Sequence, residues 1–357
     1  MFNKLYVSIK NYIKDNYKIL IVFLLIFLFF TIKLPFYVSA PGGILDTSNK
    51  IDIASDFKLK GSLNMAYVSQ MDGNIPILLY SLVNPNWDIE KEKDITVGDE
   101  SVADLEYRNK MLMEEANDIA LLVAYDYTKT PYTLFNNKVF VTYIDEEAKT
   151  NLRVGDQILK VDGNEVTNKK FLFDYIKTKT PKEKIKFMVL RDGKEKECYS
   201  TLINVSGDTK VGIIITEDVT IKSDAHVSLK FKDTESGSSG GMMMALSIYS
   251  YLNKKDLTSG KKIVGTGTID REGNVGEISG VKYKLIGAVK ADSDIFLVPQ
   301  GENYVEARNL KNKKGYDIDI VPVETFDDVL KYLSQWKLTY FFELFLLFTL
   351  HFVKNIV

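Results

Sequence analysis

The stretch that decides the fold is SGSSGGMMMALSIY, residues 236–249. Serines and glycines up to Gly241 predict a turn, and the apolar run that follows predicts a helix. Such a turn exposes a side chain at the helix start, where backbone N–H groups have no partner within the helix. This arrangement suits a nucleophile whose attack on a carbonyl group creates an oxyanion.

Two segments downstream offer partners for such a nucleophile. GTGTI, residues 265–269, predicts a strand followed by a turn at Glu272-Gly273-Asn274, and VGEISGVKYK, residues 275–284, contains two lysines. Serine reacts only after a base removes its proton, and a lysine is such a base only when it is neutral. The lysine pKa must therefore fall from ~10.4 to ~7–8, which burial against apolar side chains such as Ile278 and Val281 would achieve.

In order and spacing these segments resemble the proteolytic domain of Lon proteases, and the similarity covers residues 206–335. The resemblance implies an α/β domain with a catalytic dyad, in which Ser239 is the nucleophile and Lys282 is the base. It also implies that Thr266 orients the lysine amine and that Gly240 supports the nucleophile. Three residues depart from the family pattern: Ser238 replaces proline, Gly240 replaces alanine and Ser279 replaces glycine. Ser238 is therefore a rival hydroxyl beside Ser239.

A trypsin-like serine protease is the competing interpretation of the Gly-Ser-Ser-Gly-Gly turn. That class needs a histidine and an aspartate placed well before the serine. The chain has two histidines, and His226 lies only thirteen residues before Ser239, while His351 lies after it. We therefore exclude this class.

A second module is predicted over residues 125–205. Val139–Thr142 predicts a strand, and RVGDQILKVDG, residues 153–163, places a Gly-Asp turn before an Ile-Leu-x-Val strand. This pattern resembles PDZ domains, which bind an extended peptide as an added strand. A purely structural β-rich domain is the alternative. The resemblance implies that the peptide docks along Asn137, Lys138, Val139 and Phe140.

Residues 41–124 predict a mixed α/β region with a structural role, a collar. Strands are expected at Ser62–Val68 and Ile77–Leu82, joined by a turn at Asp72-Gly73-Asn74. Apolar residues at helical spacing predict a helix over Asp99–Tyr127.

Apolar runs lie near both ends of the chain. Ile19–Ile32 and the apolar residues after Lys33 predict a membrane anchor over residues 19–38. Four lysines precede this run, so the positive-inside rule predicts that residues 1–18 are cytoplasmic and that the bulk is extracytoplasmic. A cleaved signal peptide is the alternative, although Pro41 after the small residues 38–40 disfavours cleavage. For the apolar run in the tail, residues 336–357, a membrane segment, an interfacial helix and a packing tail all stay open.

Composition argues against nucleic acid and metal ions as partners. The chain has 46 basic and 48 acidic residues, so no basic excess favours nucleic acid. The single cysteine, Cys198, forms no intramolecular disulfide, and no CxxC pair offers zinc ligands. No cofactor or metal is predicted, and the G-x-x-x-x-G-K-[ST] motif of ATPases is missing from the sequence.

The sequence therefore predicts an α+β multidomain protein with an N-terminal transmembrane helix, a PDZ-like β-rich module and a Lon-type proteolytic domain. This order resembles the membrane-anchored, ATP-independent Lon-like PDZ serine proteases. The resemblance implies cleavage of extended peptides or exported proteins at the outer face of the cell membrane. A catalytically inactive, membrane-tethered PDZ scaffold is the alternative. The oligomeric state stays open, a homo-oligomer included.

Overall fold

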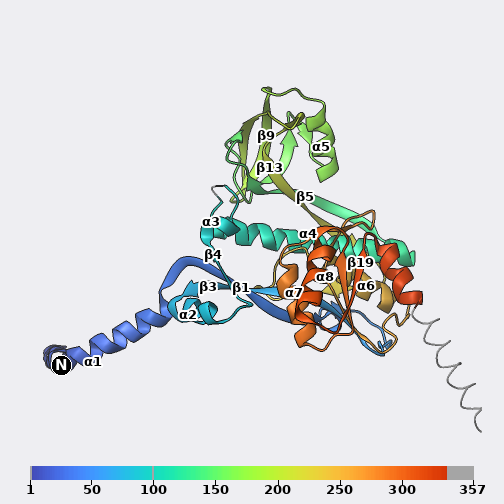
Figure 1. Cartoon of the computed structure of the whole chain (residues 1–357). Coiled ribbons are helices and arrows are strands. Elements are labelled where there is room, and N and C mark those ends of the chain that lie inside the picture. Colours follow the sequence, from blue (N-terminus) through green and yellow to red (C-terminus); the bar gives the residue numbers. More distant parts are fainter. Residues whose placement is uncertain (1, 99, 336–357) are drawn as a thin grey trace, which may run out of the picture. The chain divides into compact units, whose positions relative to one another are not determined.

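The structure, a computed structural model, describes residues 2–98 and 100–335 (Figure 1). The apolar run predicted in the tail, residues 336–357, lies outside the described residues. The chain divides into two compact units. One comprises Met1–Pro41 and Val68–Ile95, and the other comprises Gly42–Tyr67 and Thr96–Val357. Strands β1 (Lys33–Asp46) and β3 (Ser62–Asn74) contribute residues to both units.

The first unit corrects one sequence prediction. Residues 77–82, expected as a strand, belong to helix α2 (Ile75–Val83). Asn74 caps this helix by accepting a hydrogen bond from the Ile77 amide (2.9 Å), and Pro76 occupies the first turn, where its missing N–H costs nothing. The unit also contains β4 (Asp88–Lys91), which pairs antiparallel with β1, and the short helix α3 (Glu92–Ile95).

The predicted membrane anchor over residues 19–38 finds no support in the described helices. Helix α1 (Phe2–Thr31) contains the apolar run, but it ends at Thr31, and the chain continues as strand β1 from Lys33. Within the described ranges, no helix reaches the length and apolarity needed to cross a membrane.

In the second unit, a parallel sheet forms the centre of the region that carries the candidate catalytic residues. Strand β15 (Lys262–Gly265) pairs in parallel with β3 on one side and with β18 (Ile295–Pro299) on the other, and β18 pairs with β19 (Asp319–Val323). Successive side chains alternate between two apolar clusters, so both faces of the sheet are covered. The region predicted as a separate collar thus supplies a strand to this core, because Leu63 and Met65 of β3 lie in one of the clusters.

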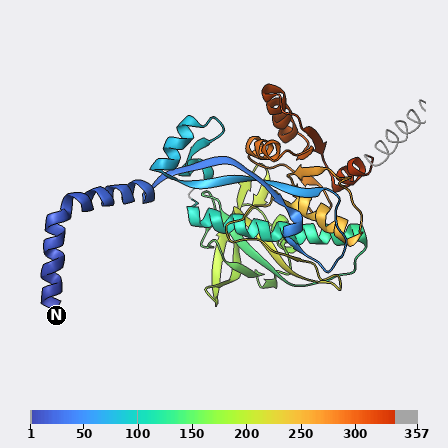
Figure 2. The same cartoon turned by 90° about the horizontal axis from the view of Figure 1, so that it is seen from below.

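Helices cover the two faces of this sheet (Figure 2). Helix α6 (Gly241–Leu252) packs in the first cluster beside α4 (Val102–Thr128), and α7 (Val281–Lys290) and α8 (Glu302–Lys314) pack in the second. Residues 326–335 are also helical. Short elements complete this region: η1 (Thr47–Asn49), β2 (Ile51–Asp52), β14 (Ser228–Leu229), β16 (Thr268–Ile269) and β17 (Val275–Gly276).

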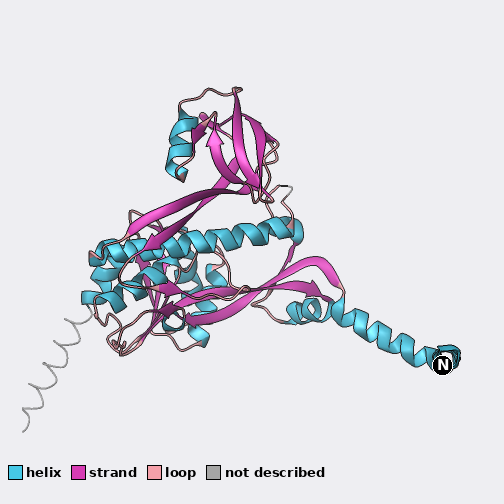
Figure 3. Cartoon of the chain, turned by 180° about the vertical axis from the view of Figure 1, so that it is seen from behind, coloured by secondary structure: helices cyan, strands magenta, loops and turns pink. Residues whose placement is uncertain are grey.

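The second unit also contains a strand-rich module with one longer helix, α5 (Lys169–Lys177), drawn in cyan against magenta strands in Figure 3. Its main sheet has the strand order β13-β5-β7-β9-β10-β6, with β8 beside β7, and it encloses its own apolar cluster. The strands are β5 (Thr133–Ile144), β6 (Lys149–Thr150), β7 (Gln157–Val161), β8 (Asn164–Glu165), β9 (Lys184–Arg191), β10 (Lys194–Thr201), β11 (Ile203–Val205), β12 (Asp208–Lys210) and β13 (Ile213–Lys222).

This sheet extends past the predicted module boundary at residue 205. Strand β13 follows that boundary, yet it pairs antiparallel with β5 along most of its length. Because β13 occupies one end of the strand order, its outer side faces no other strand among the described residues. Strand β13 is thus an edge strand of this sheet.

Candidate active site

The serine-rich turn before α6 is held in a defined conformation. Gly237 adopts a φ of +95°, which favours glycine, and its amide donates to the Asn109 carbonyl of α4 (3.0 Å). A Cβ at Gly240 would lie 2.9 Å from the Met65 sulfur, so a larger residue here would require the Met65 side chain to move. Ser239, between these glycines, is half-buried rather than enclosed. A substrate can therefore reach Ser239 from the solvent.

Three hydrogen bonds join this turn to the residues that follow β15. The Gly267 amide donates to the Ser239 carbonyl (2.8 Å), and the Met242 amide donates to the Gly267 carbonyl (3.1 Å). The buried Thr266 hydroxyl donates to the same Ser239 carbonyl (3.2 Å). The structure thus brings Ser239, Gly240 and Thr266 together, and the contact made by Thr266 is with the turn of the serine.

The two lysines of α7 have different surroundings. Lys282 is half-buried. Its amide donates to Glu306 Oε1 (3.2 Å), and its Nζ lies 5.2 Å from the ring centroid of Tyr283. Lys284 is only 3% exposed, and among the described residues no carboxylate forms an ion pair with it. Burial lowers the pKa of the Lys284 ammonium from 10.5 to about 8.

Lys284 is the functional candidate that sequence reasoning missed. A signal for it was present in the spacing, because Val281, Lys284, Leu285 and Ala288 follow the i, i+3, i+4, i+7 pattern of one helix face. The three apolar members of this set lie in the cluster between α7 and the sheet. Residues 282 and 284 are two positions apart and so lie on nearly opposite sides of the helix. Only one of them shares the buried face.

A second buried lysine provides a comparison. Lys50 is 7% exposed, and its Nζ is 2.6 Å from Glu235 Oε1. This ion pair gives the Lys50 amine a carboxylate partner inside the fold. Lys284 lacks such a partner in the described part of the chain, so of these two buried lysines it is the one suited to act as a base.

Met65 and its neighbour connect the serine turn to α7. Gly240 approaches the Met65 side chain of β3, and the next residue, Ala66, packs in the cluster that contains Val281 and Leu285 of α7. The turn of Ser239 and the helix of Lys284 therefore contact adjacent residues of one strand. Met65 and Ala66 point to opposite faces of the sheet, so the serine turn and α7 pack at the same level along β3 but against opposite faces.

The structure places the predicted peptide-docking residues of the strand-rich module inside the sheet and not at its edge. Val139 and Phe140 lie in β5, which pairs with β13 on one side and with β7 on the other, so their backbone groups are already used. The Asn137 amide donates to Glu217 Oε1 (3.0 Å), and Lys138 Nζ lies 4.0 Å from Asp218. Both side chains therefore contact β13. The terminal strand on that side of the sheet is β13, and helix α5 contacts this strand.

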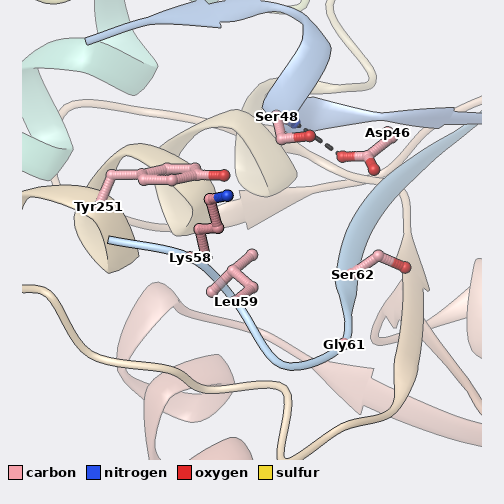
Figure 4. Close-up of a pocket in the computed structure, with 7 residues that line it drawn as sticks. All are labelled: Asp46, Ser48, Lys58, Leu59, Gly61, Ser62 and Tyr251. Atoms are coloured by element: carbon pink, nitrogen blue, oxygen red, sulfur yellow. Dashed lines mark hydrogen bonds between the residues drawn. The ribbon is translucent and has the colours of Figure 1, made fainter. Parts of the chain in front are cut away.

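A polar cavity of about 200 Å³ lies elsewhere in the second unit (Figure 4). It is at the amino-terminal end of β3, whereas Ser239 is joined to residues after the carboxyl-terminal end of β15, which runs parallel to β3. The cavity contains none of the predicted site residues, so it is separate from the candidate active site. It is lined by Asp46, Ser48, Lys58, Leu59, Gly61, Ser62 and Tyr251.

Comparisons with known proteins agree with both modules. Residues 114–201 match the PDZ domain family, and residues 200–335 match the Lon protease (S16) C-terminal proteolytic domain. The Lon protease of Xanthomonas oryzae pv. oryzae is 31% identical over 145 residues, which are 40% of this chain and 17% of the relative. The Lon protease of Campylobacter jejuni is 30% identical over 123 residues, 34% of this chain and 15% of the relative. The chain thus spans about a sixth of the length of these curated relatives.

Solved structures of two PDZ domains are similar to part of this chain. The PDZ domain of the SdrC-like protein from Listeria innocua is 26% identical, covers 22% of this chain and 92% of its own, and has a TM-score of 0.21. The corresponding domain from Listeria monocytogenes is 22% identical, covers 23% of this chain and 90% of its own, and has a TM-score of 0.22.

Proposed function

We propose that this chain, a Lon-like PDZ protease by the matches of its two modules, is a serine endopeptidase that cleaves extended polypeptide segments. The observation that carries the proposal is the serine turn at the start of α6. Hydrogen bonds from Gly267 and Thr266 hold the Ser239 carbonyl, while the Ser239 side chain is only half-buried. A nucleophile needs this combination of a fixed backbone and an accessible hydroxyl.

We assign the role of base to Lys284 in place of the predicted Lys282. A pKa of about 8 leaves a substantial neutral fraction of Lys284 near neutral pH, which a proton acceptor requires. The Lys282 backbone amide donates to Glu306, and its Nζ lies beside the ring of Tyr283 at the start of α7. The assignment rests on burial and on the position of α7 beside Ala66.

The reaction that follows from these roles has two stages. The Lys284 amine takes the proton of the Ser239 hydroxyl as its oxygen attacks the scissile carbonyl, and the resulting ammonium donates that proton to the departing amine. A water molecule then attacks the acyl-enzyme ester with the neutral amine again acting as base, and the carboxylic acid product leaves the regenerated serine. Each stage returns the lysine to its starting protonation state.

The Gly240 amide is the candidate donor to the oxyanion. The neighbouring Gly241 and Met242 amides donate to the carbonyls of Ser238 and Gly267 (both 3.1 Å). Among the described residues no acceptor pairs with the Gly240 amide. It directly follows the nucleophile and lies at the start of α6, where the helix dipole favours negative charge.

The PDZ module recruits the substrate in this proposal. An extended peptide adds as a strand along the outer side of β13, next to α5, because no described strand pairs with that side. Ile215→Pro would remove an amide from that edge and should weaken cleavage of unfolded proteins more than cleavage of a short peptide. An equal loss on both substrates would contradict recruitment by β13.

The reaction needs no nucleotide in this proposal, because the sequence lacks the ATPase phosphate-binding motif. The extracytoplasmic location stays a prediction from the lysines that precede residue 19, and the described helices add no support for an anchor. External protease added to intact cells tests it, since a cytoplasmic protein would be fully protected.

A fluorophosphonate probe tests the enzymatic proposal. It should label the purified chain at Ser239, and Ser239→Ala should abolish both labelling and peptide cleavage. Ser238→Ala is the matched control and should retain both. Loss of activity in Ser238→Ala alone would move the nucleophile by one residue. No labelling of the folded wild-type chain would favour the inactive PDZ scaffold instead.

A further inference from the structure

The outer side of β13 is open along only part of its length. The Glu217 amide donates to Glu115 Oε1 of α4 (3.0 Å), and the Val219 amide approaches Asp118 Oδ2 of α4 (3.5 Å). Backbone groups alternate sides along a strand, so the amides of Ile213 and Ile215 face the same side as these two. Two carboxylates of one helix therefore cover one half of the edge, and the other half has no strand partner among the described residues.

These carboxylates are built into a wider set of contacts. Glu115 Oε1 also accepts from Lys169 Nζ (2.7 Å), and Glu217 Oε2 accepts from the Lys169 amide (3.0 Å) at the start of α5. Glu115 and Asp118 are three residues apart and so lie on the same face of α4. Helix α4, the β13 edge and the start of α5 thus meet at one junction.

The same helix contacts the serine turn. The Asn109 carbonyl of α4 accepts from the Gly237 amide (3.0 Å), and a Cβ on Gly241 would lie 3.7 Å from the Ala116 carbonyl. Asn109 precedes Glu115 by six residues, which is ~9 Å along a helix. One rigid element therefore touches the peptide edge of the PDZ module and the turn that carries Ser239.

We propose that α4 is an autoinhibitory element: its Glu115 and Asp118 side chains occupy the β13 amides that a long bound peptide would use, and their displacement frees the serine turn through Asn109. The inference rests on the proposed peptidase function and deepens it. A peptide that pairs only with Ile213 and Ile215 leaves α4 in place. A longer segment must replace both carboxylates. Only a long extended polypeptide, such as an unfolded chain, would therefore displace them and activate the serine turn.

The test uses the full chain and two measurements. The variant Glu115→Ala/Asp118→Ala removes both carboxylates, and Glu115→Gln/Asp118→Asn keeps their shape while removing their charge. Glu106→Ala is the matched control, because Glu106 is an exposed carboxylate on α4 with no described contact to β13. Thermal unfolding establishes that each variant is folded before it is compared.

Hydrogen exchange should show the amides of Glu217 and Val219 exchanging about tenfold faster in the double alanine variant than in the wild type, because each amide loses its side-chain acceptor. The rate of Ser239 labelling by a fluorophosphonate probe should rise about fivefold or more in the same variant. Glu106→Ala should match the wild type in both measurements, and the charge-removing variant should change both in the same direction as the double alanine variant.

The outcomes separate this inference from the proposed function. Labelling of Ser239 at one rate in every folded variant would overturn autoinhibition and leave the peptidase standing. Slower labelling in the double alanine variant would mean that α4 supports the serine turn, which also contradicts the inference. Absence of labelling in all chains would reject the peptidase itself.

Discussion

The Thr266 hydroxyl donates a hydrogen bond to the Ser239 carbonyl at 3.2 Å, with the threonine fully buried. Because the Gly267 amide bonds to the same carbonyl, the threonine acts as a second restraint on the serine turn. Thr266→Val keeps the shape of the side chain and removes this bond, so it should lower the free energy of unfolding by about 1 kcal/mol.

The same substitution should lower kcat about tenfold, because a small displacement of a nucleophile is costly. Thr266→Ser restores the hydroxyl and should recover most of the rate. An unchanged kcat in a folded Thr266→Val variant would show that the restraint is not needed for the reaction.

The paired lysine substitutions distinguish the two candidate bases. Lys284→Met should lower kcat by about 10²–10⁴, the usual contribution of a general base. The fold should survive, because methionine fits an apolar site that already disfavours charge. Lys284→Arg should be equally inactive, since a guanidinium stays protonated. Lys282→Met is the matched control. Loss of activity in Lys282→Met, with activity kept in Lys284→Met, would support the dyad of Ser239 and Lys282 that the sequence predicted.

The pH profile should report the Lys284 amine. Only the neutral form accepts a proton, so kcat/KM should rise with pH and level off above about 8. Its pKa is lowered from 10.5, so between these values the unfolded state binds more protons and the free energy of unfolding should rise with pH. Activity that is flat between about pH 6 and 9 would argue against a lysine base.

Asp118 should make stability fall as pH rises. Burial, with added repulsion from Asp218, Glu114 and Glu115, raises the pKa of Asp118 from 3.8 to about 7 against the opposing hydrogen bond from Val219. Between these values the folded state holds a proton that the unfolded state has lost, so the free energy of unfolding declines with pH and levels off above about 7.

Denaturant titrations at several pH values measure this decline, and Asp118→Asn should remove part of it. Asp224→Asn, which changes an exposed carboxylate, is the control and should leave the slope as it is. The same slope in wild type and Asp118→Asn would assign the decline to other groups.

Local sequence patterns were sufficient to predict many of the turns and helices of the molecule. The small-residue turn before α6, the Gly-Asp turn before β7 and the helical spacing of α4 depend on residues close together in the chain, and each was found. The strand expected at residues 77–82 failed for a local reason as well. Asn74 and Pro76 form a helix start that outweighs the apolar run after them.

Burial and long-range pairing were decided only by the tertiary structure. Lys282 and Lys284 have the same chemistry, and they differ because α7 turns one of them toward the sheet, where water is excluded and the ammonium is disfavoured. The peptide edge that we propose lies on β13 and not on β5, because a strand formed after residue 205 pairs with residues 69 (213 − 144) to 89 (222 − 133) positions earlier. The sequence thus determined which residue types and turns were available, and the fold determined which lysine loses its hydration and which strand keeps an open side.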